Sequence, residues 1–353
     1  MLDINLELTN HCNARCVFCV AGNPDIIPHN LEKKGFMSEK LFHKIVKDLS
    51  ENVYDPFIHP KLDGELCVRF TGFGEPLLHP KFLEFFHITT RIKGLTKIML
   101  TTNGQLLTKH MLSTMLDYIK NRSFILELNV GLDANTEATR QKIKGLSKLS
   151  MLKDTLNHML FLRQKHNLTN LKPIFQFILG YDNKQEVAGF VDYWSKQLTK
   201  HKIDYEICND YPKRDCGTYI WIKKRDGSTP EEDKKNTKLH KQVTTKWVKH
   251  SDNKAPTSSK TDVCPWAFNA ANITWNGLVT PCCMDVDLEL CIGDLKKQTL
   301  KEIYHSEYIM KLKNAHILRD LKEFPHCYEC GLFYRDMGLD EDSLKNHKRI
   351  AKI

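Results

Sequence analysis

Apolar residues recur with two different periods along residues 1–209 of the chain. Short runs rich in β-branched and aromatic residues predict six β-strands, at residues 4–9, 66–72, 97–103, 126–133, 172–179 and 204–208. Between them, apolar residues return every three or four positions, which predicts amphipathic helices, most clearly at residues 38–52, 80–93 and 109–121. Ser38 has the character of a helix N-cap, and one apolar face follows it: Phe42, Ile45, Val46 and Leu49.

Strands that alternate with helices favour a parallel sheet with right-handed crossovers. Six such strands predict an α/β fold, a partial (β/α)6 TIM-like barrel, whose chemistry lies at the carboxyl ends of the strands. Residues that could bind a metal or ligand follow the predicted strands in order. They are a three-cysteine loop, the segment GFGE (72–75), Asn103-Gly104 and Asp133. We therefore expect a functional site at the carboxyl edge of this sheet.

The pattern divides the chain into four parts. Residues 1–209 form the predicted core barrel, 210–262 a lysine-rich insertion or linker, 263–335 a small cysteine-rich domain, and 336–353 a polar tail. The segment from residue 222 to 262 is polar and has no clear period, which predicts a solvated surface excursion. A substrate lid or a nucleic-acid contact is the alternative, although no nucleic-acid-binding motif accompanies the lysines.

The composition of the chain indicates its compartment and the class of its chemistry. The chain has 353 residues, a formal net charge of +9 and 12 cysteines. No apolar run is long enough to span a membrane, and the acidic, alternating N-terminus does not resemble a signal peptide, so we expect a cytoplasmic protein. Reducing compartments do not sustain structural disulfides, so the cysteines indicate metal or redox chemistry.

The segment NHCNARCVFCVAG (10–22) carries the strongest chemical signal. Its thiols, Cys12, Cys16 and Cys19, are separated by three and two residues. Three thiolates are too few for a closed tetrahedral zinc site. They suit a [4Fe–4S] cluster with one iron left open, because four cysteines are the closed form, and an open iron invites a chelating ligand from outside the protein.

This loop, together with GFGEP (72–76) and GLDA (131–134), resembles the radical SAM superfamily over residues 4–190. The resemblance implies that Cys12, Cys16 and Cys19 hold the cluster and that S-adenosylmethionine (SAM) chelates its free iron. In that family an electron from the cluster cleaves SAM, and the resulting 5′-deoxyadenosyl radical takes a hydrogen atom from an unactivated carbon.

The resemblance also implies contacts to the adenine and methionine parts of SAM. Phe18 is the aromatic residue expected near the adenine. Gly72 and Gly74 let the backbone approach the methionine moiety, whose ammonium meets Glu75 or a neighbouring carbonyl. An ordinary strand-to-helix turn is the alternative explanation for the two glycines.

Three further residues are cofactor-binding candidates by the same resemblance. Asp133 falls in the segment near the ribose, although Gly131 replaces the usual serine. Lys144 stands where the family has a basic residue for the SAM carboxylate, and a lysine binds as a point charge where an arginine grips with two bonds. Asn103 is the third candidate. Alternatively, Asp133 caps a helix and Asn103 only forms a turn.

The C-terminal cysteines form a second group: Cys264, Cys282, Cys327 and Cys330. The pieces GLVTPC and CYEC resemble the SPASM/Twitch extension of radical SAM enzymes, and the spacing resembles that of 2-deoxy-scyllo-inosamine dehydrogenase-type proteins. The resemblance implies one auxiliary [4Fe–4S] cluster with four protein ligands. A four-cysteine zinc knuckle is the alternative. The segment WNGLV (275–279) predicts a β-hairpin next to this group.

The function expected from these features is a radical SAM oxidoreductase that oxidises a sugar or aminocyclitol carbon by two electrons. An epimerase is the first alternative, with Cys208, at the end of the sixth strand, as the best-placed hydrogen donor ahead of Cys216 and Cys283. A peptide-modifying maturase is the second, and a non-catalytic metal-binding module is the rival of another class. Expected partners are a sugar-like or peptide substrate and an electron donor such as flavodoxin or ferredoxin, with neither a membrane nor a nucleic acid.

Overall fold

The computed structural model describes residues 2–21, 33–52, 65–209, 217–226, 229–248 and 264–328. Its strands form one ten-stranded sheet in the order β10-β9-β8-β1-β2-β3-β4-β5-β7-β6. The strands are β1 (Leu2–Leu6), β2 (Leu66–Phe70), β3 (Leu95–Thr102), β4 (Ile125–Gly131), β5 (Leu171–Leu179), β6 (Glu206–Cys208), β7 (Tyr219–Lys224), β8 (Ala270–Ile273), β9 (Leu278–Thr280) and β10 (Gly293–Asp294).

The helices connect successive strands of the first part and then gather in the C-terminal part. They are α2 (Glu39–Asn52), η1 (Pro76–Leu78), α3 (Phe82–Thr89), α4 (Lys109–Ile119), α5 (Glu137–Lys144), α6 (Leu149–Lys165), η2 (Lys184–Glu186), α7 (Val187–Lys200), α8 (Pro230–Thr244), α9 (Trp266–Asn269), α10 (Leu300–Tyr304), α11 (Glu307–Leu318) and α12 (Pro325–Tyr328). Within the described residues, none of these helices combines the length and the apolar character needed to cross a membrane.

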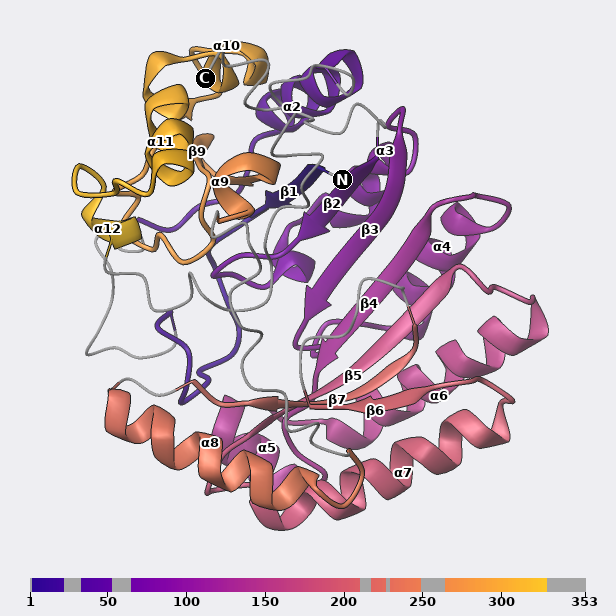
Figure 1. The fold of residues 1–353 in the computed structure, drawn as a ribbon. Helices are drawn as coiled ribbons and strands as arrows, with labels where there is room; N and C mark the ends of the chain where they lie inside the picture. The colour runs from indigo at the N-terminus through magenta and orange to yellow at the C-terminus, as the bar shows by residue number, and fades with distance from the viewer. Residues whose placement is uncertain are drawn as a thin grey trace.

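The first part is the expected partial barrel. Strands β1 to β5 pair in parallel in chain order, and all six predicted strands are present. Figure 1 shows the sheet curving, with α3, α4, α6 and α7 on its outer side. That side holds the core, where Phe175 of β5 stacks on Trp194 of α7 with ring centroids 4.0 Å apart. The predicted N-cap of the first helix is confirmed, since Leu41 N donates to Ser38 Oγ at 3.3 Å.

The described parts of residues 210–262, predicted as an insertion or linker and from 222 onward as a solvated surface excursion, contain a strand and a helix that pack on the barrel. Strand β7 lies inside the sheet, between β5 and β6, so β6 is an edge strand and does not contact β5. Helix α8 follows and buries Leu239 and His240, whose Nε2 lies 2.7 Å from the carbonyl oxygen of Ile222. The many lysines obscured the pattern of this helix, although its start has two ordinary helix signals. Thr229 accepts a hydrogen bond from Glu232 N, and three acidic residues fill the first turn.

The C-terminal part continues the same sheet. Strand β8 pairs in parallel with β1, and β9 returns antiparallel to β8, which confirms the hairpin predicted from WNGLV. Gly277 adopts φ +90°, a conformation that favours glycine, at the turn of this hairpin. Figure 1 shows α9 to α12 gathered beside β1, at the end of the sheet opposite β6. Cys216, Cys330 and the tail at 336–353 lie outside the described residues.

A buried carboxylate fastens the C-terminal part to the barrel. Asp48 of α2 is 5% exposed, and its Oδ2 accepts hydrogen bonds from Leu300 N (2.9 Å) and Lys44 Nζ (3.1 Å). Leu300 is the first residue of α10, so this carboxylate binds an N–H group that has no partner within its own helix.

We expect Asp48→Ala to lower the free energy of unfolding by about 1–3 kcal/mol, because it leaves a buried donor unsatisfied. The measurement is urea denaturation followed by circular dichroism. Asp154→Ala, which removes an exposed carboxylate from α6, is the matched control. Equal midpoints for the two variants would contradict the assignment.

Candidate functional site

Backbone hydrogen bonds hold the three-cysteine loop from two sides. On one side, Arg15 N donates to the carbonyl of Lys144 at 2.8 Å and Val17 N to that of Ile143 at 3.0 Å. These carbonyls belong to the last turn of α5, where a helix leaves its acceptors free. On the other side, Glu75 N donates to the carbonyl of His11 at 2.8 Å. The loop is thus fixed over the carboxyl ends of β1, β2 and β4.

The thiols of this loop are half-buried and act on one another electrostatically. Burial raises the pKa of Cys16 to about 12, against the lowering effect of Lys144, and burial likewise raises the pKa of Cys12. In the described part of the chain, no three cysteine sulfurs all lie within 4.8 Å of one another.

The GFGE turn fits closely against the cysteine loop. A Cβ atom at Gly74 would lie 2.0 Å from the carbonyl oxygen of Thr9, and one at Gly72 would lie 2.7 Å from Glu7 Cγ. Glycine is therefore required by close approach at both positions, which an ordinary turn does not demand.

Glu75 lies beneath this turn and does not face an open space. It is 2% exposed, and its carboxylate accepts hydrogen bonds from Thr102 Oγ1 (2.7 Å), Asn103 N (2.8 Å) and Leu77 N (3.2 Å). Burial raises its pKa, while the bonds from Asn103 and Thr102 act in the opposite direction. Of the two groups expected near the ammonium of SAM, the position of Glu75 favours the neighbouring carbonyl.

Asp133 and Lys144 meet in a buried ion pair at the end of β4. Lys144 Nζ lies 2.6 Å from Asp133 Oδ2 and donates to the carbonyl of Gly131 at 2.8 Å. Asp133 Oδ1 accepts from Ile178 N at 2.7 Å, so the carboxylate also joins β4 to β5. Burial acts to lower the pKa of Lys144, but the negative charges of Asp133 and Cys16 outweigh this effect, and the pKa is raised overall. Both residues lie under the loop, 1% and 4% exposed.

Asn103 connects the end of β3 to the cysteine loop. Its Nδ2 donates to Asn13 Oδ1 at 2.8 Å, and its Oδ1 accepts from Gln105 N at 2.9 Å, so it also forms the predicted turn. Arg140 of α5, which we did not predict, donates to the carbonyl of Asn103 at 2.9 Å and is fully buried. Its only signal in the sequence is a charged residue on the buried face of a helix.

Phe18 is half-buried in the cysteine loop, and the guanidinium of Arg225 lies over its ring at 5.4 Å from the centroid. Arg225 directly follows β7, in the segment predicted to be an insertion. That segment therefore contributes a side chain to the candidate site.

The concave face of the barrel carries polar pairs that the sequence analysis missed. Because side chains alternate along a strand, this face is the one opposite the helices. Lys97 Nζ lies 2.9 Å from Glu127 Oε2, and Arg69 of β2 lies 3.3 Å from Asp3 of β1. Amides pair in the same way, as Asn129 Nδ2 donates to Gln176 Oε1 at 3.0 Å. The signal available in the sequence was the alternation of polar and apolar residues along these strands.

Cys208 ends β6, as predicted, and lies on the same face as these pairs. It packs against Ile174, Tyr219 and Trp221, a small cluster separate from the main core. Cys208 is half-buried and lies opposite Trp221 in the strand register.

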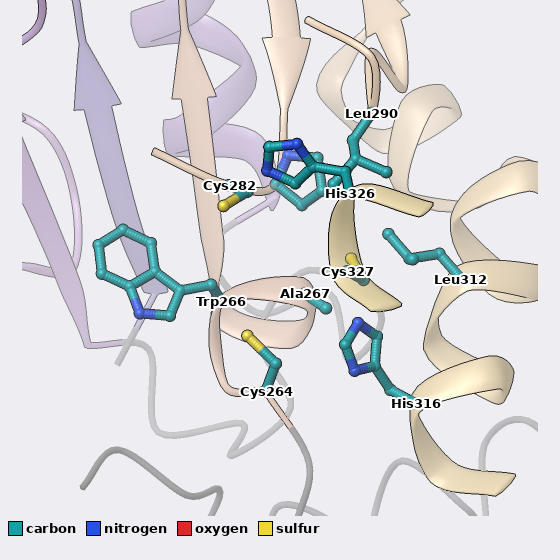
Figure 2. Close-up of a pocket in the computed structure, with 10 residues that line it drawn as sticks. Cys264, Trp266, Ala267, Cys282, Leu290, Leu312, His316, His326 and Cys327 are labelled. Atoms are coloured by element: carbon teal, nitrogen blue, oxygen red, sulfur yellow. The ribbon is translucent and has the colours of Figure 1, made fainter. Parts of the chain in front are cut away.

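The cysteines of the C-terminal part line a pocket of their own. Figure 2 shows Cys264, Cys282 and Cys327 around it, from three separate segments, with His316 and His326 beside them. Burial raises the pKa of Cys282 to about 12 and lowers that of His316 to about 4. Apolar side chains complete the wall: Trp266, Ala267, Pro281, Leu290 and Leu312. Three of the four predicted ligands are thus brought together, and the fourth, Cys330, lies outside the described residues.

Buried Asp285 organises the segment that carries Cys282. Its carboxylate accepts hydrogen bonds from Thr280 Oγ1 (2.6 Å), Glu289 N (2.8 Å) and Leu290 N (3.0 Å). The next residue, Cys283, is exposed. The loop begins after Thr280, whose carbonyl oxygen accepts a hydrogen bond from Asn272 Nδ2 at 3.2 Å, and Asn272 pairs with Asn5 on the concave face of the barrel.

Comparison with known families defines the class of the protein. Residues 6–160 match the radical SAM superfamily, and residues 264–331 match SPASM, an iron-sulfur cluster-binding domain. The chain thus carries a radical SAM domain and, after it, a SPASM domain. These domains imply [4Fe–4S] clusters and SAM as cofactors, and the two groups of cysteines fit the clusters by donor chemistry.

Individual relatives are similar over part of the chain. A GTP 3′,8-cyclase of Actinobacillus pleuropneumoniae is 30% identical over 149 residues, which cover 42% of this chain and 38% of that protein. The corresponding protein of Thermodesulfovibrio yellowstonii is 25% identical over 58% of this chain and 54% of its own length. The chain therefore spans well under two thirds of the length of these relatives.

Solved structures are similar in fold over nearly the whole chain. BtrN in complex with AdoMet and 2-DOIA has a TM-score of 0.53 at 16% identity and covers 97% of both chains. The anSMEcpe enzyme with bound AdoMet has a TM-score of 0.57 at 15% identity and covers 100% of this chain and 97% of its own. Streptococcus suis SuiB bound to S-adenosylmethionine has a TM-score of 0.56 at 15% identity, over 94% of this chain and 71% of its own.

We expect Gly74→Ala to displace the cysteine loop, because the new methyl group meets backbone atoms, and to cost about 1–3 kcal/mol of stability. Iron retained by the N-terminal site after reconstitution should fall as well. Gly131→Ala is the matched control, since its Cβ would meet side-chain atoms of Lys144 and Asp133 at 3.2 and 3.6 Å and no backbone atom nearer than 3.8 Å. Equal iron contents and melting temperatures in the two variants would refute the close fit.

Proposed function

We propose that the protein is a radical SAM oxidoreductase that oxidises a carbon of a sugar-like or aminocyclitol substrate by two electrons, with loss of one hydrogen from that carbon and one from its hydroxyl or amino group. The observation that carries this proposal is the position of the two cysteine groups around one polar concave face. The first group lies over the carboxyl ends of its strands, and the loop of the second follows Thr280, whose carbonyl accepts from Asn272 beside Asn5 of that face. The likeness in fold to BtrN with AdoMet and 2-DOIA supports the choice of substrate class.

In this proposal the residues of the site have separate roles. Cys12, Cys16 and Cys19 hold the cluster that binds SAM, and Cys264, Cys282, Cys327 and Cys330 hold the auxiliary cluster. When bound, the first cluster and SAM supply the 5′-deoxyadenosyl radical. The Gly72–Gly74 turn and Phe18 bind the methionine and adenine parts, while Asp133 and Lys144 support the loop from below. We propose that the barrel domain extends beyond residue 209 to include β7 and α8, and that the small cysteine-rich domain begins at residue 263.

The concave face favours a polar substrate without a large net charge. Two of its cations are paired with carboxylates, Arg69 with Asp3 and Lys97 with Glu127. Its amides, such as Asn129 and Gln176, can both donate and accept hydrogen bonds, which suits hydroxyl groups. A one-electron donor such as flavodoxin or ferredoxin completes the proposed system.

We expect the variant with Cys12, Cys16 and Cys19 all changed to Ala to lose 5′-deoxyadenosine formation. About half of the iron should remain, because the second group of ligands is intact and holds a similar cluster. The measurements are chromatography of the nucleoside and iron analysis. Undiminished cleavage of SAM in this variant would sink the assignment, and zinc at the second site would exclude an auxiliary cluster.

Epimerisation is the second candidate, because the thiol of Cys208 lies on the concave face. An epimerase returns a hydrogen atom to the opposite face of the carbon, from a thiol that exchanges with water. In D2O, our proposal expects a product that lacks two hydrogen atoms, formed equally well by Cys208→Ala. Deuterium at an inverted carbon, lost in Cys208→Ala, would replace oxidation by epimerisation.

A further inference from the structure

Arg225, which directly follows β7, connects the cysteine loop to the end of that strand. Its guanidinium carbon lies 5.4 Å from the centroid of the Phe18 ring. This distance is within the range of a cation–π interaction. Phe18 lies between Cys16 and Cys19, so whatever orients its ring also bears on the loop that carries these thiols.

Asp182 fixes the guanidinium in this place. Its Oδ1 lies 2.7 Å from Arg225 Nη2, and the two side chains are 24% and 16% exposed. Asp182 is itself held, since its loop is closed at the base by Asn183, whose Oδ1 accepts from Gly180 N at 2.8 Å. The anchor is therefore a short, fixed turn and not a mobile surface chain.

The local structure is shaped around the guanidinium. A Cβ atom at Gly180 would lie 2.4 Å from Arg225 Cζ, so the planar group packs directly on the backbone of the β5–η2 connection. Arg225 Nε is buried and has no hydrogen-bond acceptor in the described part of the chain. The ion pair with Asp182 therefore leaves one donor of the guanidinium unsatisfied, which costs stability. The contact with the Phe18 ring is the second interaction that holds the side chain here.

We propose that Arg225 is a positioning residue, which holds the Phe18 ring in the orientation that receives the adenine of SAM. This inference rests on the proposed function, in which Phe18 contacts the adenine. Arg225 acts through the ring and needs no contact with SAM itself. Its planar group, fixed by Asp182 on one edge, is suited to this stacking in a way that a lysine is not.

Equilibrium dialysis of labelled SAM against the reconstituted, unreduced protein tests the proposal without turnover. Loss of a desolvated cation–π contact should raise the Kd for SAM about tenfold in Arg225→Ala. The rate of 5′-deoxyadenosine formation at saturating SAM should not change. Arg225→Lys should keep only part of the affinity. Lys184→Ala is the matched control, because it removes a cation 5.4 Å from the exposed ring of Tyr181 and should leave the Kd unchanged.

A double-mutant cycle separates positioning of Phe18 from a general structural effect. In a Phe18→Leu background, Arg225→Ala should raise the Kd no further, because the ring on which it acts is gone. An equal increase in both backgrounds, or a wild-type Kd in Arg225→Ala, would overturn this inference while SAM binding by the wild type upholds the proposed function. Wild-type protein that holds its clusters but binds no SAM would instead overturn the proposed function itself.

Discussion

The parallel pairing of β1 with β8 is the contact on which the rest of the structure depends, because it makes the SPASM domain part of the barrel's own sheet. Leu6 lies opposite Ile273, and Glu7 N donates to the carbonyl of Ile273 at 2.9 Å. A slip of one residue would turn every side chain of β1 to the other face. Asn5 would then lose Asn272, its partner on the concave face, and Leu6 would leave the core. One register therefore positions both cysteine groups.

The cysteine loop owes its place to groups that a sequence pattern does not display. Its N–H groups bind carbonyls of Ile143 and Lys144, which any residue type would provide. The end of α5 is held in turn by the Lys144–Asp133 pair and by Gly145 in the left-handed conformation. A buried ion pair contributes little net stability, because desolvation offsets the attraction, but it fixes direction. Here it fixes the helix end that receives the loop.

The sequence predicted those features that depend on local pattern. All six barrel strands, the Ser38 cap and the Asn276-Gly277 hairpin follow from short-range spacing, and each is present. Strand β7 was missed because its lysines and those after it mask a short apolar run. The sequence also placed Glu75 and Asp133 at strand ends, where they are. It could not show that both are buried, because their partners, such as Thr102 and Lys144, are set by packing between elements.

The polar interior bears on how the positive charge of the protein is to be interpreted. The net charge is +9, yet Arg69 and Lys97 on the concave face each have a carboxylate partner. Inside a protein, a paired cation attracts an anionic ligand weakly, since the ligand must compete with a carboxylate already in place. Arg69 and Lys97 therefore add little attraction for an anionic ligand at this face. What the barrel offers at its centre is a set of fixed donors and acceptors, and such a set recognises a molecule by the arrangement of its hydroxyl or amino groups.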